Sequence, residues 1–221
     1  MSQGSSSNHD DLEPETYKIM KNIEECLVKE DDVSLEEYLR FWKHVCIVMG
    51  NWGTIFGFVV RDVQTKLGKL EEMRTSNPEA YKSIQSMAQM EYDTNTIRNQ
   101  KPNRSGTGHM MVLNRALEFV VDLLNGVFMA KDENERVSGI AKTSYDKNLS
   151  HYHSWPIRQL VAAALLTLPR KNEFLIRLRG KMPANEDERF HLVFEQDGRE
   201  IINRVNQLVV KFELTDYDPS R

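Results

Sequence analysis

One segment of the chain, residues 55–70 (IFGFVVRDVQTKLGKL), carries side chains that could bind a polar ligand. As a helix, it places Asp62, Lys66 and Lys69 on one face, at positions i, i+4 and i+7. The residues before them are almost wholly apolar, which is typical of a pocket wall with a polar end. An exposed Asp–Lys pair on a core helix fits the same spacing, and such a pair contributes only about 0.3–0.5 kcal/mol.

Other chemistry is poorly represented. The sequence has no P-loop, Gly-x-Gly-x-x-Gly, HExxH or CxxC motif. His151 and His153 are two residues apart and would point to different faces of a helix, which disfavours a shared metal ion. Asp62, a lysine and a histidine could form an acid–base site, but no serine or cysteine stands beside them as a nucleophile. We therefore expect no enzyme, no metal and no cofactor.

The composition favours a soluble, cytoplasmic protein. The 221 residues are 40% hydrophobic and 28% charged, as in globular proteins, and no apolar run approaches the ~18 residues of a membrane-spanning helix. The net charge of −4 gives no support for a nucleic-acid partner. Cys26 and Cys46, the only cysteines, favour a reducing compartment. The polar N-terminus, MSQGSSSNHDD, does not resemble a signal peptide.

Charge is unevenly distributed along the chain. Residues 10–37 contain eleven acidic side chains and three lysines, whereas residues 155–182 contain six basic side chains and one acidic one. The basic stretch is compatible with binding to anionic membranes or partners, and equally with ordinary solvated helix faces.

Helical periodicity extends through most of the sequence. Ser34 and Glu37 have the spacing of a capping box, and Pro78 suits the first turn of a helix. The segments that we predict to be helical are approximately 14–28, 34–49, 54–74, 78–92, 109–129, 133–152, 156–168, 171–179 and 186–214.

These segments predict an all-α protein of about eight helices, without strands or internal repeats. Residues 1–12 are expected to be a disordered tail and 13–221 a single domain, because no internal linker is long enough to separate two. The polar loop 93–106 carries Arg98, Lys101 and Arg104. The small residues at 162–164 would let a neighbouring helix approach or leave space for a ligand.

Three ordered motifs indicate a family. The first is G-T-I-F-x-F-x-x-x-D-V-x-x-K-L at 53–67, the second is L-N-R-A-L at 113–117, and the third is Y-H-x-W at 152–155, followed by an apolar helix and L-P at 168–169. Together they resemble the glycolipid transfer protein superfamily, and most closely its ceramide-1-phosphate branch. The likeness covers about residues 35–178 and continues more weakly to the end.

This resemblance implies a two-layer helical sandwich that carries one sphingolipid between membranes. Asp62 matches the aspartate that holds the ceramide amide and headgroup, and His153 matches the histidine that binds the amide carbonyl. Lys66 matches a lysine of the phosphate branch, and Lys69 one of the glycolipid branch. These roles suit the side chains, because a carboxylate accepts from N–H and O–H groups and a lysine can bind a phosphate.

The resemblance also implies an apolar pocket and a membrane contact. Residues expected at the membrane are Trp155 and Arg158. Those expected to line the pocket are Phe58, Leu117, Val161 and Leu165.

Two positions depart from both branches of the superfamily. Where the phosphate branch has two arginines four residues apart, this chain has Gly108 and Val112. The glycolipid branch has at the second position a tryptophan that stacks on the sugar, a role that valine cannot fill. Lys66, Lys69 and Arg104 would supply compensating positive charge, so a phosphorylated or small headgroup is weakly favoured over a sugar.

The leading hypothesis is a non-enzymatic carrier that acts as a monomer and meets membranes transiently. A glycosphingolipid carrier, a sphingolipid sensor or adaptor without net transfer, and a lipid-acting enzyme using Asp62 and His153 are the alternatives. Transfer between membranes by the purified protein separates a carrier from a sensor, and turnover of the lipid would indicate an enzyme.

Overall fold

The computed structural model describes residues 13–27 and 31–220, and within these ranges it is all-α with no strand. The tail predicted for residues 1–12 lies outside the described residues. The first half of the fold contains α1 (Glu15–Cys26), α2 (Leu35–Gly50), α3 (Gly57–Ser76) and α4 (Ile84–Asp93). The second half contains α5 (Gly106–Met129), α6 (Val137–Asn148), α7 (Trp155–Leu166), α8 (Lys171–Arg179), α9 (Asp187–Val193) and α10 (Arg199–Lys211).

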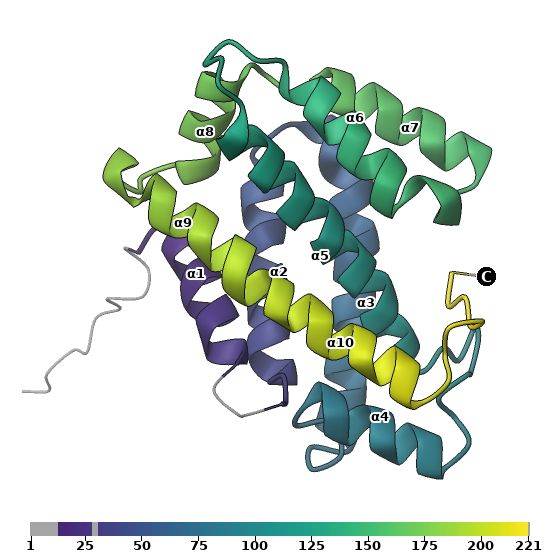
Figure 1. Ribbon diagram of the computed structural model, residues 1–221. Helices are drawn as coiled ribbons and strands as arrows, with labels where there is room; N and C mark the ends of the chain where they lie inside the picture. The colour runs from purple at the N-terminus through teal and green to yellow at the C-terminus, as the bar shows by residue number, and fades with distance from the viewer. Residues whose placement is uncertain (1–12, 28–30, 221) are drawn as a thin grey trace, which may run out of the picture.

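The helices form the two layers that the sequence predicts. The helix α1 packs on α2, and α2 packs on α3. In Figure 1, α5 and the α9–α10 pair cross in front of α2 and α3, with α6 beside α5 and α7 beside α6. A π-helical segment, Phe194–Gly198, joins α9 to α10, so the predicted helix 186–214 is one long, nearly continuous element.

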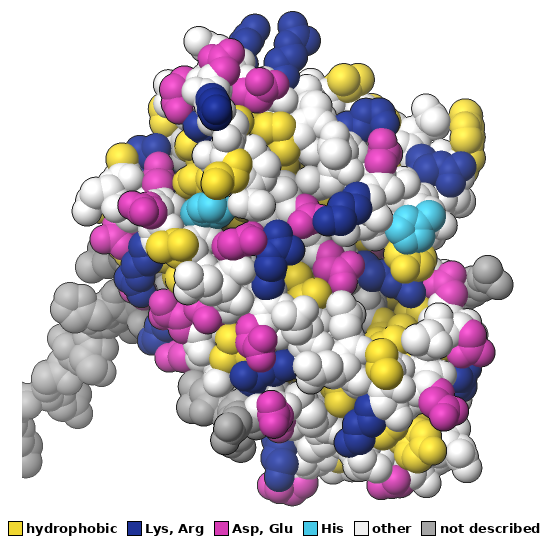
Figure 2. Space-filling model, in the orientation of Figure 1, with side chains coloured by type: hydrophobic (Ala, Val, Ile, Leu, Met, Phe, Trp, Pro, Cys, Tyr) yellow, Lys and Arg dark blue, Asp and Glu magenta, His cyan; other side chains and the backbone are white. Residues whose placement is uncertain are grey.

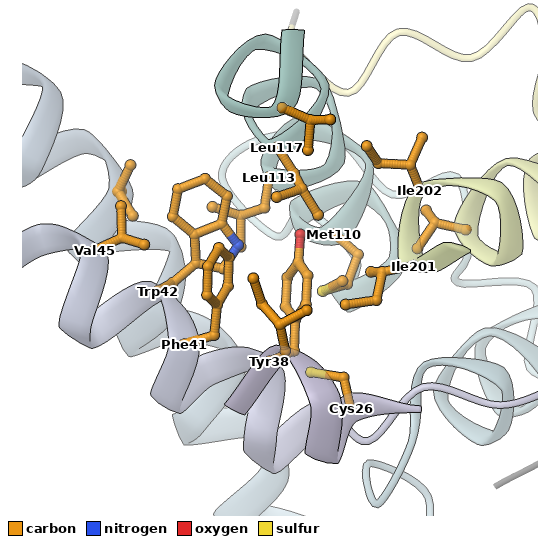
Figure 3. Packing of buried hydrophobic residues seen from close by; sticks show 14 of the residues in the cluster. Cys26, Tyr38, Phe41, Trp42, Val45, Met110, Leu113, Leu117, Ile201 and Ile202 are labelled. Carbon is orange, nitrogen blue, oxygen red and sulfur yellow. The ribbon is translucent and has the colours of Figure 1, made fainter. Parts of the chain in front are cut away.

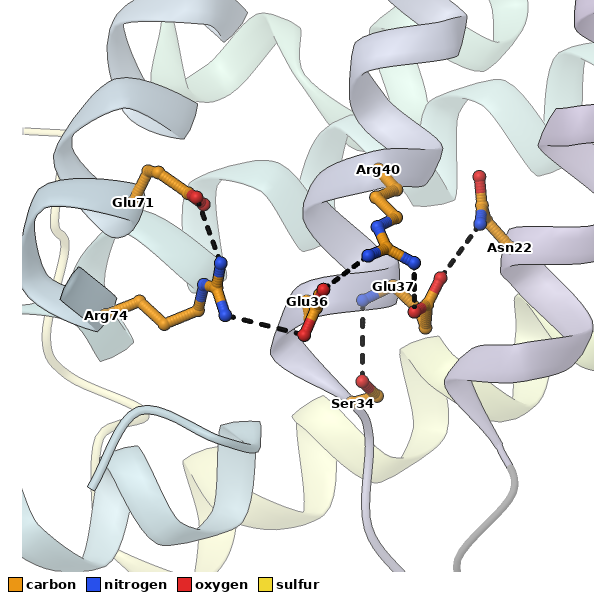
Figure 4. Close-up of polar contacts among 7 residues, drawn as sticks. All are labelled: Asn22, Ser34, Glu36, Glu37, Arg40, Glu71 and Arg74. Carbon is orange, nitrogen blue, oxygen red and sulfur yellow. Dashed lines mark hydrogen bonds and ion pairs between the residues drawn. The ribbon is translucent and has the colours of Figure 1, made fainter. Parts of the chain in front are cut away.

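Helix ends differ from the predictions at several points. Ser34 caps α2 by accepting from the Glu37 N–H, but the Glu37 carboxylate instead accepts from Asn22 and Arg40, so a reciprocal capping box does not form (Figure 4). The prediction that Pro78 begins a helix is wrong. The helix α4 begins at Ile84, because Ser83 and Ser86 form a reciprocal capping box there.

Two later helices differ in length from the predicted segments. The helix α5 begins at Gly106 and not at His109, since the Ser105 hydroxyl accepts from the Gly108 N–H. The predicted helix 133–152 is reduced to α6 and a short 3₁₀ turn, Ser150–Tyr152.

Aromatic residues of α2 form the centre of the core. Tyr38, Phe41 and Trp42 are almost completely buried, with the Phe41 and Trp42 ring centroids 5.1 Å apart. Figure 3 shows these rings facing Leu113 and Leu117 of α5 and, from α10, Ile201 and Ile202. Burying each such side chain contributes roughly 1.5–3 kcal/mol, so this contact stabilises the packing of the two layers.

Polar contacts join α2 to α3 on the outside of the first layer. Arg74 of α3 bonds Glu71 on its own helix and Glu36 on α2, and Glu36 also pairs with Arg40 (Figure 4). These side chains are partly exposed, so each pair contributes little to stability.

Candidate functional site

A cavity of about 960 Å³ lies within the helical sandwich. Its walls come from α2, α3, α5 and α7, with contributions from α9 and the π-helical segment. Most of the lining is apolar, while charged side chains of α3 and of the loop before α5 are grouped among its lining residues. Such a cavity suits an amphiphilic ligand with an apolar body and a polar group.

Three of the four residues expected in an apolar pocket do line this cavity. They are Phe58, Val161 and Leu165. The fourth, Leu117, is completely buried in the core between the layers and does not line it (Figure 3). The helix α5 presents apolar residues on two faces, and Ala116, Phe119 and Val120 occupy the face toward the cavity.

Asp62 and Lys66 form an ion pair on α3, and both residues line the cavity. The Lys66 Nζ lies 2.5 Å from the Asp62 Oδ2, and the side chain of Lys66 is 10% exposed whereas that of Asp62 is 69% exposed. Burial lowers the pKa of Lys66, while the carboxylate of Asp62 opposes this shift. The Asp62 carboxylate thus favours the charged form of Lys66, and Asp62 itself also lines the cavity.

Lys69 is more exposed than Lys66 and pairs with a different carboxylate. Its side chain lines the cavity but is half exposed, and its Nζ bonds the Glu72 carboxylate at 2.8 Å. Lys66 and Lys69 therefore share a face as predicted, yet only Lys66 is held against Asp62.

His153 reaches the cavity from the turn before α7. Its Nδ1 lies 2.8 Å from the Tyr145 hydroxyl of α6, and both side chains line the cavity. Burial lowers the pKa of His153, and the nearby Asp62 carboxylate acts in the opposite direction. A neutral imidazole that accepts from Tyr145 at Nδ1 carries its proton on Nε2, where it can donate to a ligand.

Arg104 and His109 bring further nitrogen atoms to the same cavity. Arg104 is 5% exposed and His109 is 8% exposed, and both line the cavity. Burial, followed by the positive charge of Arg104, lowers the pKa of His109 to about 4. Lys66, Lys69 and Lys101 act on His109 in the same direction, so a neutral histidine stands within a cationic cluster.

Gly108 and Val112 occupy different surroundings. Val112 lines the cavity and is half-buried, so it offers neither charge nor an aromatic ring there. Gly108 is buried, and a Cβ on it would lie 2.7 Å from the Tyr217 hydroxyl and 2.9 Å from the Arg104 Cγ.

Several participants were not identified from the sequence. His109, Tyr145 and Ser220 line the cavity, and none of them belongs to a local motif. The C-terminal residues reach the site through Arg115, whose Nη1 donates to Asp218 and Ser220 at 3.1 Å and whose guanidinium lies 3.5 Å from the centroid of the Tyr152 ring. Residue spacing cannot predict the contacts with Asp218 and Ser220, because these partners lie about a hundred positions from Arg115 in the sequence.

The surface around α7 and α8 exposes apolar side chains between basic ones. Trp155 is 66% exposed and Leu166 is 77% exposed, with Leu160 and Ile176 also exposed. Arg158 does not line the cavity; its Nη1 donates to the His153 carbonyl at 3.0 Å. Figure 2 shows hydrophobic and basic side chains interleaved along the upper part of the molecule.

Two kinds of structure are absent from the described residues. None of the helices there has the length and apolar character needed to cross a bilayer. No group of three or more His, Cys, Asp or Glu side chains is placed there to hold a metal ion.

Fold and cavity together define an all-α protein built to enclose an amphiphile with an anionic or polar group. The family model described as glycolipid transfer protein (GLTP) matches residues 33–180, which is more than half of the chain. The chain belongs to the glycolipid transfer protein family, which confirms the resemblance inferred from its three motifs.

Relatives within the family are similar over most of the chain. A ceramide-1-phosphate transfer protein of Bos taurus is 33% identical over 172 residues, covering 75% of this chain and 80% of that protein. The apo form of the mouse ceramide-1-phosphate transfer protein superposes with a TM-score of 0.83 at 25% identity, covering 92% of this chain and 98% of that one. The human protein in complex with 12:0 ceramide-1-phosphate gives a TM-score of 0.80 at 27% identity, covering 90% and 97%.

Proposed function

We propose that this protein extracts one sphingolipid from a membrane, encloses its chains and releases it at another membrane, with ceramide-1-phosphate as the favoured ligand. The observation that carries the proposal is the apolar cavity of about 960 Å³ with Asp62, Lys66, Arg104 and His153 among its lining residues. The similarity to proteins named for ceramide-1-phosphate transfer supports the same ligand class.

The proposed ligand fits the groups of the cavity one by one. The free carboxylate oxygen of Asp62 would accept from the amide N–H and hydroxyl of the ceramide. The Nε2–H of His153, fixed by Tyr145 at Nδ1, would donate to the amide carbonyl. The ammonium of Lys66 would bind the phosphate as a point charge, and the apolar walls would take the chains.

The headgroup preference rests on charge and on the missing ring. Lys66, Lys69, Lys101 and Arg104 are cationic residues of the cavity lining, which favours an anion. Val112 offers no aromatic face on which a sugar could stack, so a glycolipid loses a contact of roughly 1–3 kcal/mol by analogy with other stacked ligands.

No bond-making step is included in the proposal. Transfer needs only differential binding of the lipid and reversible docking, for which the exposed Trp155 and the neighbouring basic residues supply apolar and electrostatic contacts. Recovery of an intact lipid after incubation separates this carrier from a lipid-acting enzyme.

The test begins with the bound lipid. Organic extraction of the purified protein followed by mass spectrometry is expected to identify a ceramide-based lipid. Vesicle-to-vesicle assays should then show ceramide-1-phosphate moving faster than galactosylceramide. A protein that retains a sphingolipid without moving it would be a sensor or adaptor, and one that moves neither lipid would contradict the proposal.

A further inference from the structure

The C-terminal residues 214–220 cover the beginning of α5. The Tyr217 hydroxyl donates to the Asn99 carbonyl at 2.8 Å, Arg98 pairs with Asp216 at 2.9 Å, and Arg115 pairs with Asp218 at 3.1 Å. Figure 1 shows this segment and the loop before α5 running beside each other. The tail is therefore held at three points around the polar lining of the cavity.

Tyr217 takes the space that a side chain at position 108 would need. A Cβ on Gly108 would lie 2.7 Å from the Tyr217 hydroxyl and 2.9 Å from the Arg104 Cγ, both far inside van der Waals contact. With position 108 a glycine, the Arg104 Cγ and the Tyr217 hydroxyl both pack closely against the first turn of α5. Arg104 lines the cavity from the loop before α5.

Arg104 and His109 both carry buried polar atoms without a partner. The Nε of Arg104 and the Nδ1 of His109 form no hydrogen bond with any residue that the structure describes. Both side chains are more than nine-tenths buried and line the cavity. Buried polar atoms are normally paired, so two side chains that line one cavity and each keep an unpaired nitrogen point to a ligand that supplies hydrogen-bonding groups.

The backbone of α5 does not compete for that ligand. The Glu91 carboxylate accepts from the Gly106 and Thr107 N–H groups, and the Ser105 hydroxyl accepts from the Gly108 N–H. With these donors already satisfied, an anion at this end of the cavity meets side chains only.

We propose that Arg104 and His109 form, beside Lys66, an anion-binding subsite for a phosphomonoester, and that Tyr217 is the positioning residue that holds Arg104 in it. This inference rests on the proposed lipid-transfer function and adds the residues that select its headgroup. The phosphate oxygens accept from the Arg104 guanidinium and from the protonated ring nitrogen of the neutral His109 imidazole. The same chemistry would accept inorganic phosphate.

The test compares a phosphorylated and a neutral lipid. Arg104→Gln is expected to lower ceramide-1-phosphate transfer by roughly tenfold or more, as for loss of a charged hydrogen bond, and to change galactosylceramide transfer less than about twofold. His109→Gln should lower the same ratio by a smaller factor. Lys82→Gln removes one positive charge outside the cavity and serves as the matched control.

Positioning by Tyr217 has its own readout. Tyr217→Phe removes only the hydroxyl and its bond to Asn99, so the ratio of phosphorylated to neutral lipid should fall while circular dichroism and melting stay near wild type. Arg104→Lys keeps the charge and should restore part of the ratio lost in Arg104→Gln. This partial rescue shows that a folding defect is not the cause.

Inorganic phosphate distinguishes the two sources of the anion. If it competes with ceramide-1-phosphate in wild type but not in Arg104→Gln, the subsite also takes the free anion. If it does not compete while transfer still depends on Arg104, the lipid headgroup is the ligand. Equal losses for both lipids in Arg104→Gln, or no loss for either, would overturn the subsite even where wild type transfers lipid normally.

Discussion

The Lys66 Nζ lies 2.5 Å from the Asp62 Oδ2, so the most buried ammonium of the cavity lining is held by an exposed carboxylate one helical turn away. In the proposed function, Asp62 both favours the charged form of Lys66 and accepts hydrogen bonds from the lipid. The i, i+4 spacing places the two side chains on one helix face, which allows this contact.

Replacing Asp62 should therefore abolish transfer without unfolding the protein. Asp62→Val removes the acceptor for the ceramide donors, while its exposed side chain contributes little to stability. We expect helicity and melting temperature near wild type by circular dichroism. Vesicle transfer above about half of the wild-type rate would contradict the assigned role.

Membrane docking should depend on both salt and Trp155. Charges at exposed basic residues are screened beyond ~10 Å at 0.1 M salt, so binding to anionic vesicles should weaken as salt increases. Trp155→Ala should weaken it further, because this side chain is 66% exposed and free to enter a headgroup layer. Sedimentation with vesicles measures both effects. Binding insensitive to both changes would leave α7 an ordinary solvated helix.

Headgroup preference should respond to the residue at position 112. Val112 lines the cavity, so Val112→Arg adds a cation where a phosphate would lie, and ceramide-1-phosphate transfer should rise. Val112→Trp adds an aromatic face and should favour galactosylceramide. Competition between the two lipids measures both variants against wild type. Faster glycolipid transfer by wild type would make the phosphate preference wrong.

Gly108 should be coupled to Tyr217 in stability as well as in function. Gly108→Ala introduces a Cβ 2.7 Å from the Tyr217 hydroxyl and should destabilise the protein by about 1–3 kcal/mol, as for other overpacked sites. Removing the hydroxyl in Tyr217→Phe should recover part of this loss. Urea unfolding of the two single variants and the double variant gives the coupling, and strict additivity would show that the two residues do not interact.

His109 should make the ligand-free protein less stable in mild acid. The folded protein holds the pKa of His109 at about 4, below its ordinary value of 6.5, so the unfolded state binds more protons between these pH values. Its contribution is complete above pH 6.5 and is lost as the pH falls toward 4. Burial lowers the pKa of His153 and His191 as well, and they act with the same sign.

The measurement compares wild type with His109→Gln. The change in unfolding free energy between pH 7 and pH 5 also contains contributions from carboxylates and other histidines. These contributions cancel when the two proteins are compared. We expect the loss of stability on acidification to be smaller in His109→Gln. An equal loss would show that His109 is protonated as readily in the folded protein as in the unfolded chain.

The spacing of residues along the sequence was sufficient to predict the fold class, one face of the candidate site and the family. Apolar periodicity sets which residues face the core of a helix, so the all-α fold and the shared face of Asp62, Lys66 and Lys69 follow from the sequence. The motifs at 53–67, 113–117 and 152–155 were sufficient to indicate the family, which the family model then confirmed. All three depend on residues close together in the chain.

Only the tertiary structure decided which separate segments meet. Leu117 fits an apolar stripe, but two faces of α5 are apolar, and packing against α2 directed this residue into the core and not the cavity. Pro78 suited a helix start, but the hydrogen bonds of Ser83 placed the start at Ile84. Tyr217 lies over Gly108 although about a hundred residues separate them, because the tail is held to the loop before α5 by long-range hydrogen bonds and ion pairs that no local pattern encodes.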